Sequence, residues 1–293
     1  MIRNIFYNIC FNRRFELNSL KKWNSTPILR NLNNNQRLIL SRSFSTANTE
    51  NNTKDETITI SYGPKDTLLI TGYNIKENEL KDHIKMLEES LKLKLMTLDF
   101  YSPDIANSYS ELGMVQHQSL EHINKAKENY IKSYEIWKKI KGHNSREVAN
   151  VLCLLGVVMR DLGEIEASKS TLLESLSIDT HLNTPESNLC SVYSLNNLAN
   201  ISHLQENYNE ACEYYEDAIR ILLTATSGDI NHRLISLLYY NLGCSYYRVP
   251  DMYNAMISLN RASEIISRIG DPCNILHKIS DLREEINGII SNQ

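Results

Sequence analysis

The stretch YYNLGCSYY, residues 239–247, decides the fold of this chain of 293 residues. Its Leu-Gly pair has three counterparts upstream, and the successive spacings are 43, 43 and 44 residues. The four pairs are Leu112-Gly113, Leu155-Gly156, Leu198-Ala199 and Leu242-Gly243. Self-similarity at a fixed period of roughly 20–50 residues is the signature of solenoids and other repeat architectures. The chain is therefore predicted to contain four copies of one supersecondary unit.

Each pair is followed by a small, a large and a second small residue at spacings of four and three. The four sets are Ala126, Tyr130 and Ser133; Ser168, Leu172 and Ser175; Ala211, Tyr215 and Ala218; and Ala255, Leu259 and Ala262. That spacing places each set on one face of a second helix. Glycine inside a helix costs about 0.5–1 kcal/mol relative to alanine, so its recurrence at one register needs a packing reason. We predict that the two helices of each unit are antiparallel and approach closely at this point.

The pattern resembles the tetratricopeptide repeat (TPR), in the long form of the kinesin-light-chain class. That class opens each repeat with His-Pro-x-Val-Ala and runs into Asn-Asn-Leu-Ala. Here the matching segments are residues 102–106 (SPDIA), 143–149 (HNSREVA) and 196–199 (NNLA). The resemblance covers about residues 84–270. It implies an all-α fold, a TPR-type α-solenoid of antiparallel helix pairs that binds proteins along its concave side.

The segments flanking the repeats are also predicted to be helical. Residues 77–99 have leucine and isoleucine at helical spacing and form a half-repeat, so the array is expected over 76–270. After Asp271-Pro272, Ile275, Ile279, Leu282, Ile286 and Ile290 form one apolar stripe. We expect a C-terminal capping helix at 271–293, because the end of a repeat stack must face water. Only 10 Gly and 6 Pro argue against a turn-rich all-β fold.

The first 44 residues have the composition of a mitochondrial transit peptide. Eight basic residues and one acid precede Glu50, a net charge of +7, and short apolar groups lie between the charges. The sequence Arg42-Ser43-Phe44-Ser45 resembles a matrix-peptidase site cut after Phe44. Residues 45–75 are expected to be a polar, disordered linker, although Ile58, Ile60 and Tyr62 could form a short strand. A basic tail that binds a surface is the alternative interpretation of the N-terminal segment.

Charge and cysteine spacing exclude several classes of function. The chain from Glu50 onward carries 23 basic and 34 acidic residues, so non-specific nucleic-acid binding is not expected. None of the six cysteines forms a CxxC pair, which favours free, buried thiols over a zinc or redox site. HExxH, GxSxG and phosphate-binding glycine loops are all missing from the sequence. We therefore predict a protein without catalytic residues, metal or cofactor, and no integral membrane span, because no run of 18 apolar residues occurs.

The resemblance assigns the partner-binding groove to the first helix of each pair. Carried over residue by residue, it implies a groove of Asn150, Arg160, Asn197, Asn200, His203, Tyr240, Asn241 and Arg248, with Asn107, Ser110, Met114, Cys153, Asn196 and Cys244 beside them. Asparagine amides both donate and accept, so they can pair with a bound peptide backbone. Asn197 and Asn241, one repeat apart, are expected to be exposed there. The alternative is that these asparagines are merely solvated. The lysines of the chaperone-binding carboxylate clamp are lacking.

The sequence thus predicts a mitochondrial adaptor or assembly factor that binds a protein or peptide. We expect it to act in the matrix or at the matrix face of the inner membrane. In arrangement the chain is similar to the mitochondrial tetratricopeptide repeat protein 19 family, which supports respiratory complex III. A kinesin-light-chain-like cytosolic cargo adaptor and an organellar RNA-associated helical-repeat protein are the alternatives.

Overall fold

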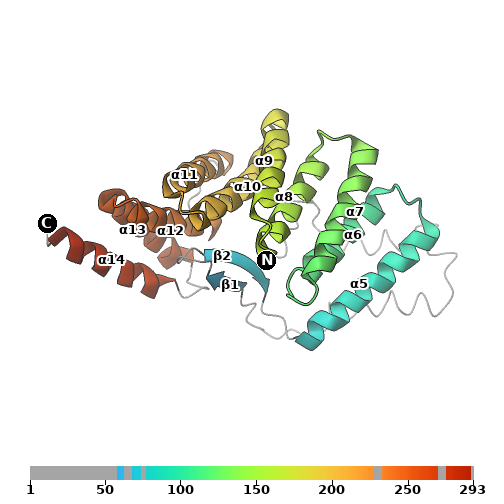
Figure 1. The fold of residues 1–293 in the computed structure, drawn as a ribbon, viewed down its shortest axis with the longest axis horizontal. Coiled ribbons are helices and arrows are strands. Elements are labelled where there is room, and N and C mark those ends of the chain that lie inside the picture. The colour runs from blue at the N-terminus through green and yellow to red at the C-terminus, as the bar shows by residue number, and fades with distance from the viewer. Residues whose placement is uncertain (1–57, 63–67, 74–76, 227–232, 270–274, 292–293) are drawn as a thin grey trace.

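The computed structural model describes residues 58–62, 68–73, 77–226, 233–269 and 275–291. In this part of the chain, two strands precede ten helices that form one elongated array, with α5 at one end and α14 at the other (Figure 1). The elements are β1 (Ile58–Tyr62), β2 (Leu68–Tyr73), α5 (Glu77–Thr97), α6 (Pro103–Gln116), α7 (Ile123–Lys141), α8 (Arg146–Asp161), α9 (Ile165–Leu182), α10 (Pro185–Leu204), α11 (Tyr208–Ala225), α12 (Arg233–Arg248), α13 (Met252–Ile269) and α14 (Leu276–Ser291).

Four helix pairs, α6–α7, α8–α9, α10–α11 and α12–α13, build the array. Short turns join the two helices of each pair, so neighbouring helices run in opposite directions. Each second helix packs against its own first helix and, up to α11, against the first helix of the next pair. Helix α5 packs on α6, and α14 packs on α13. This arrangement confirms the predicted TPR-type α-solenoid.

The glycines lie where the two helices of a pair are closest. A Cβ atom added at Gly156 would be 2.6 Å from the Cγ of Leu172, and one at Gly243 would be 2.8 Å from the Cγ of Leu259. Both leucines are completely buried. The predicted repeat register is therefore confirmed: the large residue of the second helix fills the space that glycine leaves open on the first.

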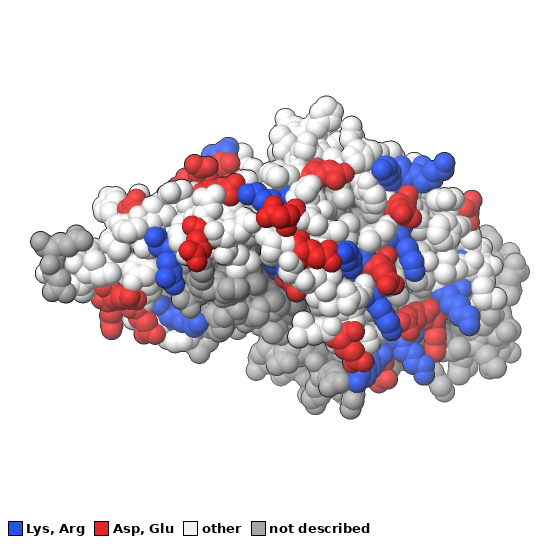
Figure 2. All heavy atoms as spheres, viewed as in Figure 1, with Lys and Arg blue, Asp and Glu red and all other residues white. Residues whose placement is uncertain are grey.

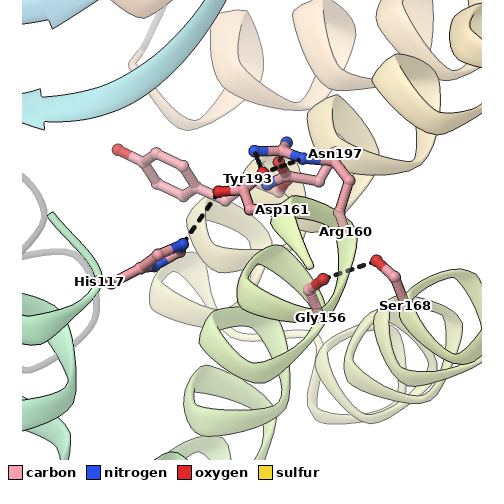
Figure 3. A network of polar contacts seen from close by, with 7 residues as sticks. All are labelled: His117, Gly156, Arg160, Asp161, Ser168, Tyr193 and Asn197. Carbon is pink, nitrogen blue, oxygen red and sulfur yellow. Dashed lines mark hydrogen bonds and ion pairs between the residues drawn. The ribbon is translucent and has the colours of Figure 1, made fainter. Parts of the chain in front are cut away.

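The small residues of the second helices form hydrogen bonds as well as leaving room. Ser168 Oγ donates to the carbonyl oxygen of Gly156 at 2.6 Å (Figure 3). Ser175 Oγ donates to the carbonyl oxygen of Ala149 at 2.8 Å. Ser133 Oγ donates to the carbonyl oxygen of Ala106, also at 2.8 Å. Serine can replace alanine at these buried positions because a carbonyl of the first helix accepts its hydrogen bond.

The range 45–75, expected to be a polar linker, contains a β-hairpin. Strands β1 and β2 pair antiparallel, with Ile58 opposite Tyr73 and an irregularity between Thr59 and Ile60. The strand sequences ITISY and LLITGY are rich in β-branched and aromatic residues, which favour strands. The predicted transit peptide, residues 1–44, lies outside the described residues.

The C-terminal helix covers the end of the array with one face. Ile275, Ile279 and Ile286 are at most 2% exposed, whereas Ile290, also part of the predicted stripe, is 49% exposed. Glu284 and Glu285 are exposed on the other side. This division into a buried and an exposed side agrees with the capping role expected for the helix. No helix in the described part of the chain is both long and apolar enough to cross a membrane.

Candidate partner-binding surface

The first helices α6, α8, α10 and α12 carry the predicted groove residues, and the structure buries most of them. Of the eight, only Arg248 is exposed. The exposed fractions of the other seven are Asn150 1%, Arg160 6%, Asn197 8%, Asn200 1%, His203 0%, Tyr240 2% and Asn241 0%. Ser110, Cys153 and Cys244 are buried as well.

The expected exposure of Asn197 and Asn241 needs correction. Each residue directly precedes the Leu of its repeat motif, and each first helix packs against its own second helix and the second helix of the preceding pair. The two asparagines are therefore part of the packing between helices. Replacing them with alanine would change stability as well as any binding, because a buried amide removed from its partners leaves those partners unpaired.

A polar network joins three consecutive repeats through these residues (Figure 3). Arg160, at the end of α8, donates from Nη1 to Oδ1 of Asn197 on α10 at 2.5 Å. Asn197 in turn donates to the carbonyl oxygen of Tyr193 at 2.8 Å. Arg160 also contacts Asp161 through Nη2 at 2.7 Å, and Asp161 pairs with Nε2 of His117 at 2.9 Å. Because His117 follows α6, the network links the first, second and third pairs.

The charges in this network determine the ionisation of Asp161. Burial alone would raise the pKa of its carboxyl group, but the hydrogen bond with His117 and the Arg160 charge together lower that pKa below its ordinary value. The carboxylate is therefore stable in its ionised form. A charged arginine with a hydrogen-bonded carboxylate partner satisfies the requirement for burying charge. Arg160 thus stabilises the junction between repeats.

A second set of contacts joins the third and fourth pairs. His203 Nδ1 lies 2.9 Å from Oγ of Ser245, and its ring meets that of Tyr208 edge to face at 4.9 Å. Within the third pair, the Tyr215 hydroxyl donates to Oδ1 of Asn200 at 2.6 Å. Four of the eight predicted residues, Arg160, Asn197, Asn200 and His203, therefore have clear structural roles.

The part of the predicted surface that reaches solvent is smaller. Asn107 and Met114 on α6 and Asn196 on α10 are half-buried, and Arg248 at the end of α12 is exposed. These four side chains come from the first, third and fourth pairs. A partner that follows the row of first helices can contact them directly, whereas it cannot reach the completely buried His203 or Asn241.

Sequence reasoning missed a row of ion pairs along the second helices. Lys127 Nζ lies 2.5 Å from Glu164, and Lys169 Nζ lies 3.2 Å from Glu210, so each pair joins one repeat to the next. The two lysines are 42 residues apart, and this recurrence is the signal that could have found them. Figure 2 shows lysine and arginine alternating with acidic residues across this view of the molecule. Such half-exposed pairs contribute little to stability, typically about 0–1 kcal/mol each.

The four cysteines within the described residues are the buried thiols that the sequence spacing predicts. Cys153, Cys190, Cys212 and Cys244 are buried thiols that form no disulfide bond. Burial raises the pKa of the Cys153 and Cys212 thiols to about 12, so their reactive thiolate forms are scarce at neutral pH. Among the described residues, no three His, Cys, Asp or Glu side chains are placed to hold a metal ion.

Comparisons with known proteins agree with this geometry. Tetratricopeptide-repeat family profiles match residues 104–181 and 192–227. The structure is similar to that of BtubC (BKLC) from P. vanneervenii, with a TM-score of 0.57, 21% identity, and 66% of this chain and 75% of that chain covered. It is also similar to a putative kinesin light chain from Podospora anserina with nearly identical TPR-like repeats, with a TM-score of 0.53 and 16% sequence identity. That match covers 66% of this chain and 90% of the other chain. The search of curated proteins gave no match.

Proposed function

We propose that this TPR-containing chain is a non-catalytic adaptor that binds a protein or peptide partner along its first helices, in mitochondria. Tetratricopeptide arrays are protein-interaction scaffolds, and stacked helix pairs give them an extended concave binding surface. The single observation that carries the proposal is the row of first helices, which presents Asn107, Met114, Asn196 and Arg248 at its accessible positions. The finer part of the proposal is an assembly or maintenance role for a respiratory complex, with complex III as the first candidate.

Two substitutions test whether the first helices bind the partner. Met114→Arg with Asn196→Arg places bulk and charge at two half-buried positions on α6 and α10. We expect capture of the partner from solubilised mitochondria to fall about tenfold or more, because an unpaired charge at the centre of an interface costs at least about 1.4 kcal/mol. The measurement is co-precipitation with tagged protein, followed by quantitative mass spectrometry.

A matched pair of arginines provides the control. Leu173→Arg with Ile257→Arg alters α9 and α13, second helices on which these side chains are each 41% exposed. This variant should retain the partner at the wild-type level. Equal loss in both variants would argue against binding along the first helices. Recovery of a partner other than complex III subunits would leave the adaptor function in place and would contradict the finer role.

Import into mitochondria gives a separate prediction. The +7 segment and the Arg42-Ser43-Phe44-Ser45 sequence predict a mature chain that starts at or near Ser45. N-terminal sequencing of the protein isolated from mitochondria measures this directly. Replacing Arg42 with glutamate should block processing, because the resemblance to a matrix-peptidase site rests on an arginine two residues before the aromatic Phe44. An intact Met1, or a protein found only in the cytosol, would contradict the mitochondrial location.

A further inference from the structure

One stripe of each first helix, which we call the concave stripe, differs in exposure along the array. It consists of the residues nine, six and two positions before the Gly or Ala of each Leu-Gly-like pair. Their spacings of three and four place them on one side of the helix. On α6 the stripe is Asp104, Asn107 and Glu111, of which Asp104 is exposed and the others are half-buried. Because α6 packs on α5 and α7 with its other sides, this stripe faces the concave side of the solenoid.

The concave stripe becomes buried towards the middle of the array. On α8 Glu147 is half-buried, and Asn150 and Leu154 are buried. On α10 the exposed fractions are Cys190 3%, Tyr193 6% and Asn197 8%, and on α12 they are Leu234 6%, Leu237 4% and Asn241 0%. The residue types change in the same direction, from charged and polar on α6 to largely apolar on α12. A single layer of helix pairs leaves its concave side open to water, so this burial needs a cover.

The helices supply part of that cover. Arg160 of α8 donates to Asn197, and Leu237 belongs to the same apolar cluster as Ile279 of α14. Neither contact reaches the middle of the stripe at Tyr193. Figure 3 shows the Tyr193 side chain extending away from Arg160 and Asn197, with a strand on that side. Figure 1 shows the hairpin of β1 and β2 next to α10 and α12, so the two views agree on the element beside this part of the stripe.

The hairpin itself needs a surface to pack on. Its register pairs Ile60 with Ile70 and Tyr62 with Leu68. Residues paired across two strands lie on the same face of a sheet, so one face of the hairpin has four large apolar residues. An isolated two-stranded hairpin is at best marginally stable in water, and packing against a helix stabilises it. The apolar face of the hairpin and the buried, largely apolar stripe of α10 therefore suit each other.

We infer that the hairpin packs its Ile60–Ile70 face on the concave stripe of α10 and so occupies the concave side of the third pair. The consequence for binding rests on the proposed adaptor function. A partner has access to the concave stripe of α6, but it has to displace the hairpin to reach that of α10. An occupant from the same chain competes at a high effective concentration, so the hairpin weakens binding at this place.

Alkylation of Cys190 tests the occupancy without any partner. The full chain is treated with iodoacetamide, and the rate of modification at Cys190 is measured by peptide mass spectrometry. Ile70→Asp should release the hairpin, because its carboxylate would otherwise be buried without a partner charge. We expect the alkylation rate of Cys190 to rise at least about tenfold over wild type. Ile60→Asp, on the other strand of the same face, should give the same result.

A matched variant and a second thiol provide the controls. Leu69→Asp introduces the same carboxylate one residue away, and Leu69 pairs with Ser61 on the other face of the hairpin. Cys190 should therefore react as slowly in this variant as in wild type. Cys212 is 6% exposed within the packing of α11 and is not part of the concave stripe. Its alkylation should stay slow in every variant, which checks that the array is folded.

Capture of the partner by the same variants separates this inference from the adaptor function. Ile70→Asp should capture more partner than wild type, and Leu69→Asp should capture the wild-type amount. Unchanged alkylation of Cys190 in both Ile70→Asp and Ile60→Asp would overturn the occupancy, and an equal rise in Leu69→Asp would overturn the assigned face. Exposure of Cys190 without increased capture would overturn the competition. If no variant captured a partner, the adaptor function would be contradicted, and the alkylation of Cys190 would still decide the occupancy.

Discussion

The Gly243→Leu variant is expected to lose most of its folded population at temperatures where wild type is stable. A Cβ atom alone at this position would lie 2.8 Å from the Cγ and 3.0 Å from the Cδ2 of Leu259, and 3.3 Å from the carbonyl oxygen of Ala255. Leucine adds three further carbon atoms in the same direction. Overpacking a core costs about 1–3 kcal/mol and sometimes more, and here the obstacle includes backbone.

Damage at Gly243 should also spread along the array. Each pair contacts only its neighbours, so α12 and α13 connect the third pair to α14. Separating these two helices removes the support of the capping helix, because the stability of a repeat array is roughly a sum of repeat and interface contributions. A thermal melt followed by circular dichroism should show a lower melting temperature, with less cooperative unfolding.

Gly288 provides a matched control for this prediction. It lies inside α14, where an added Cβ would meet nothing within 4 Å. Gly288→Leu should leave the melting temperature unchanged or raise it, because glycine inside a helix costs about 0.5–1 kcal/mol relative to alanine. If Gly243→Leu and Gly288→Leu melted alike, the assignment of Gly243 to the closest approach of two helices would be wrong.

The repeat register could be predicted from sequence because steric exclusion leaves few alternatives. A glycine or alanine recurs at spacings of 43, 43 and 44 residues, and each is followed by a large residue such as Leu172 or Leu259. This recurrence has one simple explanation, which is a close contact between helices. The stripe containing Ile279 and Ile286 predicted the capping helix for a similar reason, because apolar residues at helical spacing must face a core. These features depend on local spacing alone.

The exposure of the groove residues could not be predicted in the same way. Whether Asn197 faces solvent depends on how far α8 and α10 are rotated and displaced relative to each other. The structure brings Arg160 and Asn197, 37 residues apart, into hydrogen-bond contact. The resemblance to the TPR family placed both residues on first helices. It gave no information about the angle between successive helix pairs. The ion pair of Lys127 with Glu164 depends on that same angle.

Asp179 is a residue whose substitution should stabilise the protein. It lies near the end of α9 at the position that holds Trp137, Leu222 and Ile266 in the other pairs, all of them buried. Asp179 is itself 1% exposed, and neither of its carboxyl oxygens has a hydrogen-bond partner. An unsatisfied buried polar group costs about 1–3 kcal/mol. Asp179→Leu, which copies the residue of the third pair, should therefore raise the free energy of unfolding by an amount of that order.

The pH dependence of stability separates this explanation from simple repacking. Burial raises the pKa of Asp179 to about 8, and the Arg146 charge offsets only part of the effect. In the unfolded chain an aspartate has a pKa of about 3.9, so between about pH 4 and pH 8 the folded state holds a proton that the unfolded state has lost. Wild-type stability should accordingly fall as pH rises through this window and level off above about pH 8. Asp179→Asn, which is nearly the same shape, should remove this slope.

Asp161 provides a control of opposite sign, because its pKa is lowered in the folded state. The stabilisation that Asp161 contributes is complete above its unfolded pKa of about 3.9 and is lost as pH falls through its folded pKa. Asp161→Asn should therefore change the acid limb of the stability curve and leave the slope between about pH 4 and pH 8 as in wild type. Urea unfolding at a series of pH values measures both variants.

An Asp179→Asn protein that kept the wild-type slope would show that the Asp179 carboxyl group is ionised in the folded array. The gain expected from Asp179→Leu would then have to come from packing alone.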